Sequence, residues 1–190
     1  MLIKLSRATR YLGALLNLGG SSGPDLPADV CRIGWGSYFN GDTTPIEIPA
    51  GVETKLTLTT SGGGETEDYL PLGVSGLWDS ANSQFDFSSL EIGDMVDIRI
   101  DGSLTNTGFN ESFALNLVAG IGSPGEYTLP FASGNRLFAG TSPASRYNGI
   151  FIGSDNTKNF PAEIRMLTTD AAEGFLIDMY VKVLKRTGGP

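Results

Sequence analysis

The side chains that could do chemistry in this chain are mainly carboxylates. Its 190 residues contain no histidine and a single cysteine, Cys31. Serine or cysteine catalysis with a histidine base, histidine-ligated zinc and a histidine pH switch are therefore excluded. A single cysteine also excludes a disulfide within the chain. We interpret Cys31, beside a proline-rich segment, as a small packed residue rather than a reactive thiol.

Two groups of acidic residues lie close together in the sequence, Glu65, Glu67 and Asp68 in the first and Asp94, Asp97 and Asp101 in the second. A glycosidase needs two carboxylates that face each other across a cleft, one of them with a raised pKa. The spacing identifies no such pair, and Asp97 falls on the polar side of an alternating segment. We predict no catalytic residues and no enzyme activity. A carbohydrate-active enzyme on a sandwich scaffold remains the weakest alternative.

Side-chain oxygens recur at two further places, Asp101 with Asn106 and Asn110, and Asp155 and Asn156 with Asn159. Oxygen ligands of this kind suit calcium. Neither set has the spacing of a calcium-binding loop, and Asp-Gly and Asn-Gly steps are common in tight turns. We therefore predict no metal ion and no cofactor.

Six aromatic residues offer either a sugar-stacking platform or packing in the core and between subunits: Trp35, Tyr38, Phe39, Tyr69, Trp78 and Tyr147. Aromatic side chains contribute large apolar areas to cores and interfaces. The structural interpretation is favoured, and stacking on a host sugar is the alternative.

The net charge of −8 is unevenly distributed. Residues 33–181 carry 19 of the 21 acidic residues and six of the 13 basic ones, so the body is acidic and both ends are basic. An acidic body repels a phosphate backbone, and we predict no nucleic-acid partner. Solubility explains this acidity better than a specific cationic ligand does.

Residues 1–20 combine basic residues with a short apolar run. Leu12, Leu15 and Leu16 share one face of a helix that Ser6 can cap. A cleaved signal peptide is the alternative, although Gly13 and Asn17 interrupt the apolar run. We predict that residues 1–29 form an anchoring arm and linker, with these partner-binding residues: Lys4, Arg7, Arg10, Leu12, Leu15 and Leu16. No run approaches the roughly 20 apolar residues of a membrane span, so no membrane contact is predicted.

Alternation of apolar and polar residues predicts strands throughout residues 30–186, followed by a tail at 187–190. Val96, Ile98 and Ile100 should face one way and Asp97 and Arg99 the other. In the last strand, one face should carry Phe175, Ile177, Met179, Val181 and Val183. Loops are expected at 61–68 and 102–111, a strand at 53–58, and no helix in the body. Nine or ten short strands at this spacing predict an all-β chain, an antiparallel β-sandwich or jelly roll with an N-terminal arm or short helix.

The segments 76–80, 85–87, 90–94 and 96–99, with 147–153 and the closing strand, resemble a known family. This is the trimeric tumour-necrosis-factor-like and complement-like jelly roll of tailed-bacteriophage virion proteins, and the resemblance covers residues 70–186. It implies a homotrimer located in the virion, as a capsid decoration (cement) or head-fibre protein. The N-terminal arm would then anchor the trimer to the major capsid protein or another virion protein.

A second hypothesis comes from a different class of protein. The chain would be a tail-fibre or adhesin module that recognises a host surface glycan through the loops at 61–68 and 102–111. The resemblance carries over no catalytic residues.

Overall fold

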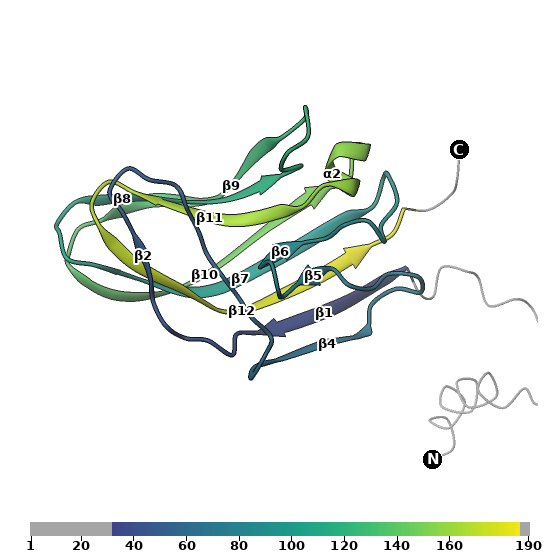
Figure 1. Cartoon of the computed structure of the whole chain (residues 1–190), viewed down its shortest axis with the longest axis horizontal. Coiled ribbons are helices and arrows are strands. Elements are labelled where there is room, and N and C mark those ends of the chain that lie inside the picture. Colours follow the sequence, from purple (N-terminus) through teal and green to yellow (C-terminus); the bar gives the residue numbers. More distant parts are fainter. Residues whose placement is uncertain (1–31, 187–190) are drawn as a thin grey trace, which may run out of the picture. The chain divides into compact units, whose positions relative to one another are not determined.

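The structure is a computed structural model that describes residues 32–186. Within this range the chain forms two six-stranded antiparallel sheets (Figure 1). Sheet A has the order β10-β7-β12-β1-β4, with β2 paired to β12. Its strands are β1 (Ile33–Phe39), β2 (Ile46–Ile48), β4 (Gly64–Tyr69), β7 (Met95–Asn106), β10 (Gly140–Phe151) and β12 (Ala172–Leu184).

Sheet B has the order β5-β6-β11-β8-β9, with β3 paired to β11. Its strands are β3 (Thr54–Lys55), β5 (Trp78–Asp79), β6 (Gln84–Phe85), β8 (Glu111–Ala119), β9 (Tyr127–Arg136) and β11 (Ala162–Thr168). The predicted antiparallel β-sandwich is therefore confirmed. No helix among the described residues is long and apolar enough to cross a membrane.

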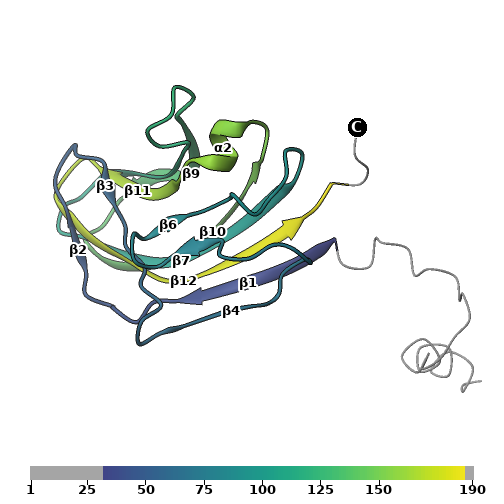
Figure 2. The ribbon, with the colours of Figure 1, turned by 45° about the vertical axis from the view of Figure 1, so that its right-hand side comes forward.

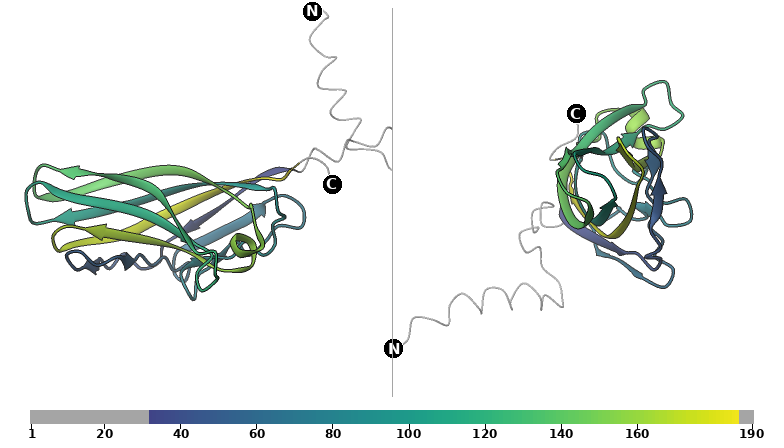
Figure 3. Two further views of the ribbon diagram at one scale, coloured as in Figure 1. Left: turned by 90° about the horizontal axis from the view of Figure 1, so that it is seen from above. Right: turned by 90° about the vertical axis from the view of Figure 1, so that its left-hand side faces the viewer.

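The chain passes between the two sheets in the manner of a jelly roll. After β7 in sheet A, β8 and β9 pair in sheet B, and β10 returns to pair with β7. Next, β11 pairs with β8, and β12 comes back to lie between β7 and β1. Figure 2 shows β4, β1, β12 and β7 in this spatial order, and Figure 3 shows the strands of both sheets around the common interior.

Apolar side chains from the inner faces of both sheets form the core. Val96, Ile98 and Ile100 of β7 are buried, as the alternation predicts. Trp78 donates its indole N–H to the carbonyl of Leu58 at 3.1 Å, so its polar atom is satisfied inside the core. Since alternate residues of a strand point to opposite faces, each buried row leaves a second row facing away from the other sheet.

A β-bulge changes the predicted pattern of the last strand. The pairing of β12 with β7 shifts between Leu176 and Asp178. As a result, Leu176 is buried, whereas Ile177 is 41% exposed and Phe175 is half-buried. The prediction that Phe175 and Ile177 share a face with Met179, Val181 and Val183 is wrong, because one extra residue resets the alternation. The last three are buried as predicted.

Three segments with few apolar residues differ from the predicted structure. Residues 64–69 form strand β4 instead of a loop, because β1 supplies a backbone partner and the carboxylate of Glu67 is fixed by local donors. The expected loop at 102–111 is shorter, since β7 continues to Asn106 between β10 and β12. The strand expected at 53–58 is limited to β3.

The body also contains one short helix that the sequence analysis did not expect, α2 (Asp155–Asn159). Ser154 caps it, accepting a hydrogen bond from the backbone N–H of Thr157 at 3.3 Å. The residues for which we predicted the arm (1–29) and the tail (187–190), and Cys31, lie outside the described residues.

Candidate interaction surface

The side of sheet A that points away from sheet B carries a row of large side chains across five strands. We call this side the outer face of sheet A. Its central row consists of Tyr69 on β4, Trp35 on β1, Tyr180 on β12, Arg99 on β7 and Tyr147 on β10. Cross-strand register brings these residues together: Trp35 pairs with Tyr69, and Arg99 pairs with both Tyr180 and Tyr147. We call them the aromatic row.

Neighbouring rings in the aromatic row stack on one another. The ring centroids of Trp35 and Tyr69 are 4.6 Å apart with an interplanar angle of 18°. Those of Trp35 and Tyr180 are 5.4 Å apart at 22°. The guanidinium carbon of Arg99 lies 5.6 Å from the ring centre of Tyr180, close enough for a cation–π contact.

This stacking determines which parts of the rings remain accessible to a partner. Because β1 lies between β4 and β12, one face of Trp35 is covered by Tyr69 and the other by Tyr180. Arg99 covers a further part of Tyr180. A sugar-stacking platform needs a free ring face, whereas a protein surface can pack against ring edges. The geometry of Trp35 and Tyr180 therefore fits protein contact better.

A pair of carboxylates lies beside Arg99 on the same face. Asp101 on β7 is directly opposite Asp178 on β12, and both side chains are 22% exposed. Arg99 Nε is 2.8 Å from Asp101 Oδ2, and Arg99 Nη2 is 3.7 Å from Asp178 Oδ1. Like charges directly opposite each other on antiparallel strands repel, and one shared proton relieves the repulsion.

The pKa values of the two carboxyl groups are shifted in opposite directions. Burial, followed by the hydrogen bond and negative charge of Asp101, raises the pKa of Asp178 to about 6. Burial alone would raise the pKa of Asp101 too, but hydrogen bonds with Ser145 and Asp178 and the charge of Arg99 lower it. Below about pH 6, Asp178 is therefore the carboxyl group that holds the proton and donates it toward ionised Asp101.

Exposed apolar side chains gather on the same face. Of the fourteen large hydrophobic residues that are exposed among residues 32–186, half lie on the outer face of sheet A. These are Ile33, Phe39, Tyr69, Met95, Tyr147, Phe151 and Ile177. Tyr147 is 61% exposed, and its hydrogen bond with Asp97 raises the pKa of the phenol to about 12. Contiguous exposed apolar area is typical of interaction surfaces, and Trp, Tyr and Arg dominate binding energy in them.

The acidic clusters singled out in the sequence have structural partners. Glu67 accepts a hydrogen bond from Tyr38 Oη at 2.5 Å and two from the backbone N–H groups of Gly76 and Leu77 at 2.6 and 3.0 Å. Buried Asp94 accepts from the backbone N–H groups of Glu91 and Arg186. These acids stabilise turns and a strand end, and they do not face each other across a cleft.

The first of the two oxygen clusters considered for calcium does not converge. Asp101 lies on the outer face of sheet A, whereas Asn106 is buried on the inner side of the same strand. Asp155, Asn156 and Asn159 belong to α2. Among residues 32–186, no three acidic, histidine or cysteine side chains are grouped as metal ligands would be.

Of the six aromatic candidates, the structure brings together Trp35, Tyr69 and Tyr147, while Phe39 lies on the same face. Tyr38 and Trp78 belong to the core. The six partner-binding residues predicted in the arm lie outside the described residues. Sequence analysis missed Tyr180, Arg99 and Asp178 as a surface. The alternation indicates that each of these side chains points away from the core. It does not indicate which strands lie side by side, so the three residues could not be recognised as one surface.

Comparison with known proteins gives distant likenesses only. No family model matches the sequence. No curated protein matches it either. Among solved structures, Eiger TNF from S. frugiperda shares 10% identity at a TM-score of 0.43, over 84% of this chain and 96% of that chain.

Viral proteins are also among the similar structures. The PRD1 vertex protein P5 shares 9% identity at a TM-score of 0.34, over 83% of this chain and 98% of that chain. A chain of the cowpea mosaic virus empty virus-like particle shares 9% identity at 0.29, over 90% and 85%. The jelly-roll assignment of this chain comes from its own strand order.

Proposed function

We propose that this chain is a non-enzymatic structural protein of a virion, a homotrimeric capsid decoration or head-fibre protein. The observation that carries the proposal is the outer face of sheet A, which holds the aromatic row and half of the exposed large hydrophobic residues of the described chain. A sheet face of this composition is stable in water when a partner covers it. The partner we assign is a second copy of the chain.

The edge strand β10 also favours a closed oligomer over open-ended association. Edge strand β10 carries Pro143 and Gly149, which discourage open-ended strand addition. At β10, association through the strand edge is therefore less favourable than association through the face. Closed rotational symmetry limits growth to a defined number of subunits. The number three follows from the family resemblance of residues 70–186.

The virion setting rests on that resemblance together with the charge distribution. Lys4, Arg7 and Arg10 are concentrated ahead of an acidic body, so the arm differs in charge from the domain that it precedes. A basic, partly apolar arm suits anchoring to a large particle. The body would then project as decoration or fibre.

The oligomer is tested by the mass of the full chain in solution. We expect a trimer by light scattering, and we expect Phe151→Glu, which places a charge on the outer face of sheet A, to shift the mass to the monomer. Phe109→Glu is the matched control, since Phe109 is 71% exposed in the turn between β7 and β8. A wild-type monomer at micromolar concentration contradicts the proposal.

The virion role is tested by co-sedimentation with empty capsids of the encoding virus. Deletion of residues 1–22 should abolish co-sedimentation and leave the trimer intact. Binding of the deleted chain to a glycan array, together with no particle binding by the full chain, would instead establish the receptor-binding alternative.

A further inference from the structure

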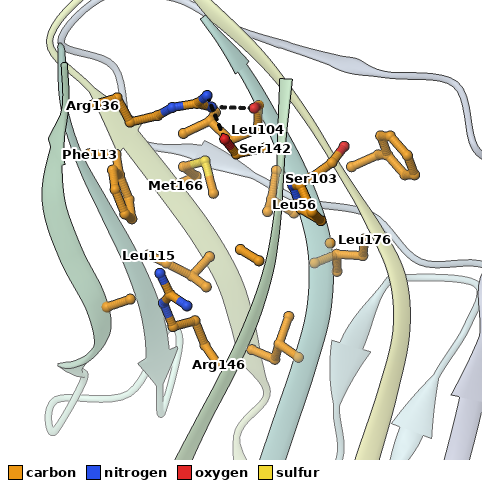
Figure 4. Close-up of a pocket in the computed structure, with 16 residues that line it drawn as sticks. Leu56, Ser103, Leu104, Phe113, Leu115, Arg136, Ser142, Arg146, Met166 and Leu176 are labelled. Carbon is orange, nitrogen blue, oxygen red and sulfur yellow. Dashed lines mark hydrogen bonds between the residues drawn. The ribbon is translucent and has the colours of Figure 1, made fainter. Parts of the chain in front are cut away.

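The interior of the sandwich is incompletely filled near strands β9 and β10. A cavity of about 230 Å³ lies between the two sheets there, and Figure 4 shows its lining. Side chains from both sheets make it apolar: Ile100, Leu104 and Leu176 from sheet A, and Leu115 and Met166 from sheet B. Its volume exceeds the roughly 150 Å³ of an apolar protein cavity that accepts benzene.

The cavity adjoins the side of the sandwich where the sheets are not joined by backbone pairing. β9 is an edge of sheet B and β10 is an edge of sheet A. Small side chains, Ala132 on β9 and Ala144 on β10, line the cavity at these edges. Because neither fills the space between the edges, the cavity persists behind them.

Polar bridges join the two edges on both sides of this gap. Asn148 of β10 donates to the carbonyl of Pro130 in β9 at 2.8 Å. Arg136 of β9 donates to Ser142 Oγ at 2.8 Å, to the carbonyl of Gly140 at 2.9 Å, and to the carbonyl of Leu104. These bridges hold β9 and β10 at a fixed separation, and Arg146 lies between them along β10.

Arg146 brings a positive charge to the cavity and has no carboxylate partner among residues 32–186. It lines the cavity, and Figure 4 shows its guanidinium extending from β10 toward Leu115. Its one hydrogen bond within the described chain goes to the carbonyl of Ser145 at 2.9 Å. None of the ion pairs formed by residues 32–186 includes Arg146 or Arg136. Guanidinium groups pair preferentially with carboxylates, and a half-buried one gains most from such a partner.

We propose that this cavity binds a small amphiphilic carboxylate. An alkyl chain or a single ring would occupy the apolar space, and the carboxylate would pair with Arg146 at the gap between β9 and β10. Arg136 would keep its bridging role, since its guanidinium already donates to three acceptors. The site lies between the two sheets and does not depend on the proposed oligomer.

The test uses the full chain, sodium octanoate as the probe and 1-octanol as its uncharged counterpart. Binding is followed by calorimetry and by the NMR signals of ¹³C-labelled methionine methyl groups. Met166 lines the cavity and Met95 is 45% exposed on the outer face of sheet A, so the two methyl groups report on different places. We expect saturable binding of one octanoate per chain that shifts Met166 and leaves Met95 unchanged.

Variants separate the two parts of the site. Arg146→Gln should weaken octanoate at least tenfold and leave 1-octanol within twofold, whereas Lys158→Gln, in α2 and outside the cavity lining, should change neither. Ala132→Phe should abolish binding of both probes, and Ala144→Leu serves the same purpose if the first variant does not fold. No saturable binding, a shift of Met95 without Met166, or equal affinity in Arg146→Gln would each overturn the proposal.

Discussion

At the scale of single residues, the chemistry of this chain is that of carboxylates placed by the sheets. The register of β12 and β7 makes Asp178 and Asp101 direct neighbours, and burial together with the hydrogen bond and charge of Asp101 raises the pKa of Asp178. Glu111 is a second case: it is fully buried at the start of β8, and burial raises its pKa above the ordinary value. Folding raises the pKa of both groups, so their contributions to stability share the same sign.

Asp178→Asn should stabilise the fold at alkaline pH. A pKa raised to about 6 means that the contribution of Asp178 is present below its unfolded pKa and is lost as the pH rises through about 6. Asparagine is neutral at every pH, so the variant should gain about 1–2 kcal/mol at pH 8 after allowance for solvent screening. At pH 3.5 it should gain nothing. Urea unfolding at one fixed protein concentration measures both.

The control for this prediction is Asp68→Asn, which changes an exposed carboxylate of β4 away from the Asp101–Asp178 pair. Its pH dependence should follow that of the wild type. Parallel curves for Asp178→Asn and the wild type between pH 3.5 and 8 would show that the two carboxylates do not share a proton.

Glu111→Gln should also stabilise the chain at neutral pH. Burial is the main cause of the raised pKa, nearby Asp170 adds to it, and Asn106 and Arg136 oppose it. The unfolded chain exposes the carboxylate, so stability falls as the pH rises above the ordinary pKa of Glu111. Thermal unfolding at pH 4 and pH 7 should show a higher midpoint for the variant at pH 7 only. A lower midpoint at pH 7 would mean that the ionised form is bound favourably.

At the scale of elements, the close approach of β4 to β1 leaves no room for a side chain at Gly34. Gly34 and Gly36 occupy the inner side of β1 next to β4, and Trp35 between them points outward. A Cβ atom on Gly34 would lie 2.1 Å from the carbonyl oxygen of Tyr69. The absence of a side chain at Gly34 therefore lets β4 pair with β1 and lets Tyr69 stack on Trp35.

Gly34→Ala should lower the free energy of unfolding by about 1–3 kcal/mol, the usual cost of overpacking. Gly64→Ala, in β4, is the control, because a Cβ there has no atom within 4 Å; its effect should stay within about 0.5 kcal/mol. Urea unfolding measures both variants. Equal stabilities for the two would mean that β4 moves to accommodate the methyl group at no cost.

At the scale of the whole molecule, the proposed oligomer and the carboxylate pair are coupled. If a second copy covers the outer face of sheet A, further burial of Asp178 raises its pKa again. Asp101 lies directly opposite Asp178, Arg99 and Tyr180 form the next outward-facing pair, and Asp97 and Lys182 form the pair after that. The acids outnumber the bases on this face, so covering it should be accompanied by proton uptake.

Association should therefore be stronger at pH 5 than at pH 8, where Asp178 is ionised in the free subunit. We expect the dissociation constant, measured by sedimentation, to rise at least threefold between these pH values for the wild type. For Asp178→Asn the rise should disappear. An equal rise in the variant would assign the effect to other carboxylates.

Much of the fold could be predicted from the sequence, because alternation is a local signal. Val96, Ile98 and Ile100 are buried and Asp97 and Arg99 are not, as the pattern indicates. The bulge at Leu176 could not be predicted, since it arises where β12 pairs with β7, whose residues are about 75 positions away in the chain. Strand β4 was missed for the same reason, because its pairing with β1 outweighs its polar composition.

The sequence by itself determined the all-β class, the acidic body and the exclusion of histidine chemistry, because composition and period-two alternation act locally. Only the tertiary structure decided which residues meet. The aromatic row takes its members from five strands, Asp178 meets Asp101, and Arg146 reaches the cavity between the sheets. These neighbours depend on strand order and register, which are set by long-range pairing and closure of the two sheets.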